Sequence, residues 1–398
     1  MAIRDRISGN EAIALAIKQV NPDVMPAFPI TPSTEIPQYF CDYAANGEVD
    51  TEFIPVESEH SSMSAAIGAS AAGARAVTAT SSCGLAFMWE ELYVAASDRL
   101  PIAMAVVNRA LSGPININAD HSDSMGARDS GWIQVYSENN QEAYDNFVQA
   151  YRIAEHKDVR LPIMVCQDGF ITSHAIENIE LLEDKEVRGF VGEYEPENYL
   201  LNEKEPYAVG PYSVSPYYFE AKRSQAAAVA NVKKVVLEVA EEFEKLSGRK
   251  YGLFEEYRME DAEYAMVIIG SAAGTSKVVV DKLRDQGEKV GLIKIRLFRP
   301  FPGEELAEAL KNVKAVAIMD RAESFSDMGG PLGAEVPAAL FKGKVLLPCI
   351  NYIYGLGGRD LLVEHVEQIF AELKEAEKEQ FVEYAPRYIG VRDLEERF

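Results

Sequence analysis

Residues 53–84 read FIPVESEHSSMSAAIGASAAGARAVTATSSCG, and this stretch says most about the fold. It begins with the carboxylates Glu57 and Glu59, continues as a run of alanine, glycine and serine, passes through a short strand pattern and ends in a Ser-Ser-Cys-Gly turn. Small side chains allow a backbone or a ligand to approach closely. A carboxylate at the start of such a segment suits a site where a flat, buried ring packs against the chain.

Short apolar runs alternate with helical patterns on both sides of this stretch. Residues 75–81, 100–109 and 161–169 are predicted strands, and residues 85–98 are a predicted helix. Ser8, with Glu11 three residues later, predicts the start of the first helix. Because strands that alternate with helices form a parallel sheet covered on both faces, residues 1–183 are predicted to form one α/β domain.

The pattern changes after residue 183. Residues 184–222 are rich in proline, charge and tyrosine and show no periodicity, and their aromatic side chains predict a segment that is packed rather than loose. A long helix with apolar residues at helical spacing follows, and Gly248 predicts its end. Residues 184–252 are therefore predicted to connect two domains.

Residues 253–398 return to the alternation of strands and helices. Apolar runs begin near residues 263, 290, 313 and 345, and helical segments at 275–285 and 303–311 separate the first three. A charged helix and a tail follow from residue 362. The predicted fold class is α/β, with two parallel-sheet domains.

Composition and charge limit the classes of function. The 398 residues carry a formal net charge of −24, which argues against binding to nucleic acid or to anionic membrane surfaces. The four cysteines form no CxxC pair, so we expect neither an iron–sulfur cluster nor a zinc ribbon held by this chain alone, and no disulfide framework. The N-terminus lacks the apolar core of a signal peptide, and no run reaches the roughly 18 apolar residues of a membrane span, so we expect a cytoplasmic protein.

Two glycine-containing motifs are weak signals. Gly270 and Gly274 follow a predicted strand, and GLGG occupies residues 355–358, but neither has the spacing of a dinucleotide-binding loop, so tight turns are the simpler interpretation. Residues 167–169, Gln-Asp-Gly, are similar to the opening of a site for thiamine diphosphate and magnesium. The first glycine of that motif is missing, so we treat the similarity as accidental.

A stronger group consists of Thr31, Glu59 and Arg109. Thr31 lies between prolines in a stiff segment, and Arg109 closes a predicted strand, at the edge where ligands enter a parallel sheet. Arginine is suited to two-pronged binding of a carboxylate. A surface ion pair for Arg109 and a helix cap for Glu59 are the competing interpretations.

The motifs, taken in order, resemble the α chains of the 2-oxoacid:ferredoxin oxidoreductase family, most closely those that act on pyruvate. The resemblance covers nearly the whole chain. Its matching segments are FPITPSTEI (28–36), SEHSSMSAAIGASAAGAR (58–75), TSSCGLAFM (80–88), NRALSGPININADHSDSMGARDSGW (108–132), QDGFITSH (167–174), GRKYGLFEEYRMEDAE (248–263), VGLIKIRLFRPFP (290–302) and YGLGGRD (354–360).

The resemblance implies a division of labour between chains. The α chain of this family supplies a domain for the pyrimidine of thiamine diphosphate and a domain similar to the transketolase C-terminal domain. A β chain holds the diphosphate and Mg²⁺, [4Fe-4S] clusters lie on β and δ chains, and a γ chain completes the complex. The complex takes pyruvate and coenzyme A and passes electrons to ferredoxin. Ferredoxins are acidic, so the charge of this chain implies that ferredoxin docks on a partner.

The resemblance also implies roles for individual residues. Glu59, directly after the serine of the SEH motif, is implied to contact the pyrimidine and activate the cofactor. Thr31 and Arg109 are implied to bind the carboxylate and keto groups of the substrate. Threonine favours a monoanionic 2-oxoacid, because related oxalate-cleaving enzymes carry a basic residue there. The other implied cofactor contacts are Pro29, Ser82, Cys83 and Gly84, and no metal ligand is implied in this chain.

Several alternatives stay open at this point. The substrate could be 2-oxoisovalerate, an aryl pyruvate or oxalate. The chain could serve a thiamine enzyme that does not use ferredoxin, or it could be a catalytically silent scaffold. Asp120, His121 and Arg128 could either shape the site or hold their loop together.

Overall fold

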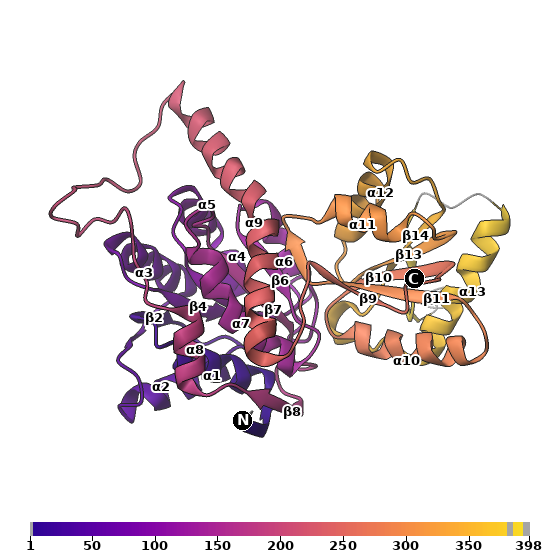
Figure 1. The fold of residues 1–398 in the computed structure, drawn as a ribbon, viewed down its shortest axis with the longest axis horizontal. Coiled ribbons are helices and arrows are strands. Elements are labelled where there is room, and N and C mark those ends of the chain that lie inside the picture. Colours follow the sequence, from indigo (N-terminus) through magenta and orange to yellow (C-terminus); the bar gives the residue numbers. More distant parts are fainter. Residues whose placement is uncertain (1–2, 380–384, 393–398) are drawn as a thin grey trace.

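The computed structural model describes residues 3–379 and 385–392, which form two lobes side by side (Figure 1). Each lobe is built on a sheet whose strands are mostly parallel. The first lobe contains the indigo and magenta part of the chain and the second the orange and yellow part. Hydrophobic side chains of both lobes belong to one continuous core cluster, so the lobes are packed against each other.

The first sheet has the order β12-β6-β7-β5-β4. Its parallel strands are fully buried, as expected for a sheet covered on both faces, and they are β4 (Val77–Thr80), β5 (Ala103–Asn108), β6 (Ile133–Tyr136) and β7 (Ile163–Asp168). On one face lies α7 (Asn140–Glu155), backed by α1 (Gly9–Val20), α8 (Asp184–Val191) and α9 (Tyr217–Ser247). The other face carries α3 (Glu59–Ala72), α4 (Ser82–Phe87), α5 (Trp89–Ser97), α6 (Ser122–Gly126) and η1 (Ala127–Asp129).

Smaller elements complete this lobe. Strand β1 (Ile3–Ser8) pairs antiparallel with β8 (Ile176–Leu181), and β2 (Val24–Ala27) pairs parallel with β3 (Glu52–Pro55). Between β2 and β3 lies α2 (Glu35–Ala45). The predicted ends of two helices are confirmed. Ser8 caps α1 by accepting a hydrogen bond from the Glu11 amide, and Gly248 ends α9 with a left-handed φ of 74°.

The second sheet has the order β15-β14-β13-β10-β11-β9, and only β9 (Phe254–Tyr257) is antiparallel. The parallel strands are β10 (Tyr264–Ile269), β11 (Val290–Ile295), β13 (Ala315–Asp320), β14 (Cys349–Ile353) and β15 (Arg387–Tyr388). One face packs against α10 (Ala272–Asp285) and α13 (Val363–Glu379), and the other against α11 (Gly303–Leu310) and α12 (Pro331–Lys342). A short helix, η2 (Leu356–Gly358), follows β14.

Three expectations need correction. The apolar run at 290–302 is not one strand, because its second half, β12 (Leu297–Arg299), crosses over and pairs antiparallel with β6 of the first sheet. The predicted helix at 85–98 begins at Ser82 and is interrupted at the buried Met88, giving α4 and α5. The segment between β13 and β14 also contains α12, which we did not predict.

The segment at 184–222 is only partly packed, contrary to the prediction. It begins with α8, and Tyr199 then packs over Gly73 of the first lobe. Beyond that point the aromatic side chains are exposed, with Tyr212 at 94% and Phe219 at 78%. Figure 1 shows this stretch and the first turns of α9 standing away from the body of the lobe. Residues 206–219 carry no charged side chain and are rich in tyrosine, which is why the sequence predicted burial that the structure does not show.

The predicted fold class, α/β with two domains on parallel-rich sheets, is confirmed. The boundaries 1–183, 184–252 and 253–398 stay a prediction. Within the residues that the structure describes, no helix is both long and apolar enough to cross a membrane.

Candidate active site

Glu59 is the first residue of α3 and lies at the edge of the first lobe's buried core. The Ser58 hydroxyl caps the helix by accepting a hydrogen bond from the Ser61 amide at 3.2 Å, which leaves the Glu59 side chain free of that task. Glu59 is only 8% exposed, and its carboxylate has no hydrogen bond or ion pair with any residue that the structure describes. A carboxylate on a mostly buried residue that has no protein partner is available to a ligand, and it marks a place where one is expected.

The Ser-Ser-Cys-Gly segment, which follows β4 and forms the first turn of α4, lies against this carboxylate. A Cβ atom added at Gly84 would stand 2.8 Å from Glu59 Oε1 and 2.5 Å from Thr80 Oγ1. Only glycine therefore permits this approach of α4 to α3. The hydroxyl oxygens of Thr80 and Ser81 are buried without a hydrogen-bond partner among the described residues. The structure thus brings Glu59 and Gly84 together, beside polar atoms that are not satisfied by the chain.

Ser82 begins α4 in a left-handed conformation, with a φ of 45°. Its amide donates to Asp123 Oδ2 at 2.9 Å, and its hydroxyl donates to the Ala110 carbonyl. The same Asp123 oxygen accepts from the Arg109 amide at 3.0 Å, and Oδ1 accepts from Asn108 Nδ2 at 2.8 Å. These bonds hold the turn after β4 against the end of β5.

Asp123 is the residue of this site that the sequence analysis missed. Burial raises the pKa of its carboxyl to about 6, against the opposite effect of the hydrogen bonds from Asn108, Arg109 and Ser82. The only sequence signal was its place in the matching segment at 108–132, where the neighbouring Asp120 and His121 drew attention first.

Cys83 lies beside this turn and is partly exposed. Its sulfur is 3.0 Å from the Ser112 hydroxyl. That hydrogen bond is the main reason that the pKa of the Cys83 thiol is lowered, and the positive charge of Arg109 adds to the effect.

Arg109 directly follows β5 and is 7% exposed. Its Nη1 donates to the Thr31 carbonyl at 2.9 Å, and its Nε donates to the Asn116 carbonyl at 3.1 Å. No carboxylate among the described residues pairs with it, so the surface ion pair that we considered is wrong. A buried guanidinium held by backbone carbonyls keeps its charge available for an anionic ligand.

The Thr31 side chain is exposed, whereas its carbonyl fixes Arg109. Pro29, two residues earlier, is also exposed, and no hydrogen bond joins it to Glu59 or Arg109 in the part of the chain that the structure describes. Contacts therefore link Glu59, the turn at 82–84, Arg109 and Thr31 into one site, while Pro29 lies at its margin.

Asp120, His121 and Arg128 hold their loop together. Asp120 Oδ1 accepts from the Ser122 amide at 2.8 Å, and Arg128 Nη1 donates to the Met125 carbonyl at 2.8 Å. His121 Nε2 lies 2.6 Å from Asp168 Oδ1. These contacts leave the structural alternative for the three residues as the better one.

Asp168, from the Gln-Asp-Gly motif, joins the two lobes. Asp168 is the last residue of β7. Its Oδ2 lies 2.8 Å from Nη1 of Arg321, which follows β13, and it accepts a hydrogen bond at 2.9 Å from the amide of Ser271, which precedes α10. Burial alone would raise the pKa of Asp168, but His121 and Arg321 outweigh it and hold that pKa well below its usual range. A carboxylate that is satisfied in this way is not free to hold magnesium.

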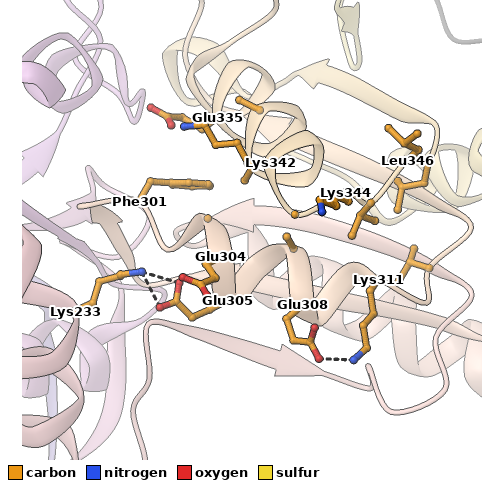
Figure 2. A pocket seen from close by; sticks show the side chains of 18 residues that line it. Lys233, Phe301, Glu304, Glu305, Glu308, Lys311, Glu335, Lys342, Lys344 and Leu346 are labelled. Carbon is orange, nitrogen blue, oxygen red and sulfur yellow. Dashed lines mark hydrogen bonds and ion pairs between the residues drawn. The ribbon is translucent and has the colours of Figure 1, made fainter.

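A cavity of about 1330 Å³ lies away from these residues, between α11 and α12 and beside α9 (Figure 2). Its charged side chains are largely paired, with Lys233 Nζ 2.8 Å from Glu305 and Lys311 bonded to Glu308. None of the site residues predicted from the sequence lines it.

Comparison with known proteins decides the family. Residues 15–241 match the family described as pyruvate flavodoxin/ferredoxin oxidoreductase, thiamine diphosphate-binding, and residues 262–366 match pyruvate:ferredoxin oxidoreductase core domain II. The chain belongs to the pyruvate:ferredoxin oxidoreductase family. The pyruvate synthase subunit PorA of Thermotoga maritima is 53% identical over 98% of both chains. The ketoisovalerate oxidoreductase subunit VorA of Pyrococcus abyssi is 43% identical over 94% of both chains.

A solved structure shares the fold. It is the 2-oxoglutarate:ferredoxin oxidoreductase from Magnetococcus marinus, with a TM-score of 0.74 and 20% identity. The match covers 94% of this chain and 65% of the other. The family membership predicted from the sequence is confirmed, and the chain is a component of a thiamine diphosphate-dependent oxidoreductase.

Proposed function

We propose that this chain is the α subunit of pyruvate:ferredoxin oxidoreductase. The complex would convert pyruvate and coenzyme A into acetyl-coenzyme A and carbon dioxide and pass two electrons to ferredoxin, or run in reverse as pyruvate synthase. The observation that carries the proposal is the unpaired carboxylate of the mostly buried Glu59, which lies against Gly84 inside the segment that matches a thiamine diphosphate-binding family.

The residues fit the pyrimidine end of thiamine diphosphate. An aminopyrimidine ring needs one carboxyl partner at its edge and otherwise apolar or small neighbours, and the α3–α4 contact offers Glu59, glycine and unpaired hydroxyl groups. Glu59 would exchange a proton with a ring nitrogen, and Ser82, Cys83, Gly84 and Pro29 would line the ring. When bound, thiamine diphosphate supplies the nucleophilic carbon and the electron sink for loss of carbon dioxide from a 2-oxoacid.

Arg109 and Thr31 would bind the substrate. The Arg109 guanidinium, fixed by two backbone carbonyls, would pair with the carboxylate of the 2-oxoacid, and the exposed Thr31 hydroxyl would donate to it or to the keto oxygen. One arginine and one neutral hydroxyl suit a monoanion better than a dianion.

Partner chains would supply the rest of the chemistry. A β subunit would hold Mg²⁺ and the diphosphate, and β and δ subunits would carry the [4Fe-4S] clusters. A γ subunit would complete the complex, and ferredoxin would dock on a partner. The complex is expected in the cytoplasm.

The test is reduction of ferredoxin or a viologen dye by the complex co-purified anaerobically through this chain. We expect reduction that requires both pyruvate and coenzyme A, with 2-oxoglutarate and oxalate inactive. Absence of reduction by any 2-oxoacid, in a complex that contains iron–sulfur clusters and thiamine diphosphate, would contradict the proposal and favour a silent scaffold.

The same assay should also be run with 2-oxoisovalerate as the substrate. The VorA relative is 43% identical over nearly the full chain, which favours 2-oxoisovalerate as the alternative. If kcat/KM is higher for 2-oxoisovalerate than for pyruvate, the proposed reaction type stands and 2-oxoisovalerate replaces pyruvate as the proposed substrate.

A further inference from the structure

The loop between Arg109 and α6 has no helix or strand of its own to fix it. Residues 109–121 contain no regular secondary structure, and residues 111–115 are exposed. The second half of this loop is held by the second lobe instead. The Gly358 amide donates to the Ala119 carbonyl at 2.7 Å, and the His121 amide donates to the Arg321 carbonyl at 2.8 Å.

The glycine-rich turn at 355–358, here called the GLGG turn, makes further hydrogen bonds to this loop. Asn116 Nδ2 donates to the Gly357 carbonyl at 3.1 Å, and the Gly357 amide donates to Asp120 Oδ2 at 3.2 Å. Asn116 is half-buried, and its Oδ1 accepts from the Asn118 amide at 2.7 Å. The Asn116 side chain is therefore fixed between the turn of the second lobe and its own loop.

The carbonyl of the same Asn116 holds Arg109. It accepts the hydrogen bond from Arg109 Nε at 3.1 Å. Among the described residues, the other hydrogen bonds of Arg109 are those from its backbone amide to Asp123 and from Nη1 to the Thr31 carbonyl. A continuous set of hydrogen bonds thus runs from the GLGG turn through Asn116 to the buried guanidinium.

Glycine is required in the turn for two reasons. Gly355, Gly357 and Gly358 have φ values of 65°, 62° and 82°, in the region that side chains disfavour. A Cβ atom at Gly357 would also stand 2.6 Å from Asn116 Nδ2, and one at Gly358 would collide with Asn118. The turn is therefore shaped for direct contact of its backbone with the loop at 116–120.

We propose that the GLGG turn of the second lobe is a positioning element for Arg109, acting through Asn116. The inference rests on the proposed function, in which Arg109 binds the carboxylate of the 2-oxoacid. It adds that substrate binding in the first lobe depends on the contact between the GLGG turn of the second lobe and the loop at 116–120. The turn does not touch the substrate, and its effect is on the orientation of the guanidinium.

Gly357→Ala tests this in the intact complex. The added methyl group displaces Asn116, so the KM for pyruvate should rise about five- to twentyfold, which is part of the contribution of a hydrogen bond to a charged group. The values of kcat and the affinity for thiamine diphosphate should change much less, because the lost interaction is one that substrate and transition state share.

Gly287→Ala is the matched control. Gly287 also lies in a turn of the second lobe and has a φ of 86°, but nothing stands within 4 Å of an added Cβ atom. This variant carries the same backbone strain and should keep the wild-type KM. Equal KM values for pyruvate in Gly357→Ala, Gly287→Ala and the wild type would overturn the inference.

Asn116→Ala provides a second route if Gly357→Ala does not assemble. It removes the side-chain bond to the turn but keeps the carbonyl, so the KM for pyruvate should rise in the same direction by a smaller factor. The double variant Gly357→Ala/Asn116→Ala should be no worse than Gly357→Ala alone, because the steric conflict is gone. Additive losses, or an unchanged KM in Asn116→Ala, would contradict the proposal. If the wild-type complex shows no activity with any 2-oxoacid, that result contradicts the proposed function rather than the role of the GLGG turn.

Discussion

Arg109 is a buried cation whose guanidinium meets backbone carbonyls rather than carboxylates. Arg109→Met should therefore lower kcat/KM for the 2-oxoacid about tenfold to a hundredfold, since a hydrogen bond to a charged group contributes about 1.5–3 kcal/mol. Most of the loss should be in KM, measured in the viologen assay with the complex.

Arg109→Lys separates charge from geometry. Lysine keeps the positive charge but cannot reach both the Thr31 and Asn116 carbonyls as a planar fork does. We expect an intermediate KM. A KM for pyruvate that is unchanged in both variants would remove Arg109 from the substrate site.

Single residues were predicted best where a motif fixes both type and place. Glu59, Gly84, Arg109 and the need for positive φ in the GLGG turn follow from the sequence. The structure brings Gly84 against Glu59 and links Arg109 to the neighbouring Ser82 through Asp123, and the roles of these residues stay a prediction. Asp123 could not be predicted, because its role depends on hydrogen bonds from Ser82 and Arg109, which lie far from it in the chain.

At the scale of elements, the contact between α3 and α4 depends on the missing side chain at Gly84. Gly84→Ala puts a methyl group within 3 Å of the Glu59 carboxylate, so the carboxylate must move. A displacement of about 1 Å in an active site can cost about a hundredfold in kcat, and we expect a loss of this order in the viologen assay.

Gly68→Ala is the control from the same helix. Nothing stands within 4 Å of an added Cβ atom at Gly68, which lies in the middle of α3. This change should stabilise the helix by about 0.5–1 kcal/mol and leave turnover unchanged. Normal turnover in Gly84→Ala would show that the α3–α4 contact does not set the position of Glu59.

The elements themselves were predicted where local pattern decides them. The buried strands β5 and β7 and the end of α9 at Gly248 follow from apolar runs and a glycine stop. The transfer of β12 to the first sheet could not be predicted in this way, because it depends on Arg296. The side chain of Arg296 is buried and donates hydrogen bonds to Asn146 and Gln149 of α7. Such a crossing is set by tertiary packing, which periodicity does not record.

At the scale of the whole molecule, Asp168 holds the two lobes together through Arg321 and Ser271 of the second lobe. Asp168→Asn leaves Arg321 buried without its charge partner, so the free energy of unfolding at pH 7 should fall by about 3–5 kcal/mol. Urea unfolding of the full chain measures this. Asp158→Asn is the control, because Asp158 is exposed and its replacement should cost less than about 0.5 kcal/mol.

The same variant has a defined pH dependence. Because the folded-state pKa of Asp168 is lowered, its stabilisation is present above the usual carboxyl range and is lost as the pH falls. The difference between wild type and Asp168→Asn should therefore shrink below about pH 4. A difference that stays constant down to pH 3 would show that the ionised carboxylate is not the stabilising form.

The central claim is that Glu59 is the carboxyl that activates bound thiamine diphosphate, and one comparison tests it directly. Glu59→Gln and Glu57→Gln change the same group two residues apart, but Glu57 is exposed and bonded to Ser61, outside the site. We predict that the Glu59→Gln complex assembles and loses pyruvate-dependent reduction by about 10²–10⁴-fold, the usual contribution of an acid–base group, whereas Glu57→Gln keeps wild-type turnover. Normal turnover in Glu59→Gln would contradict the account.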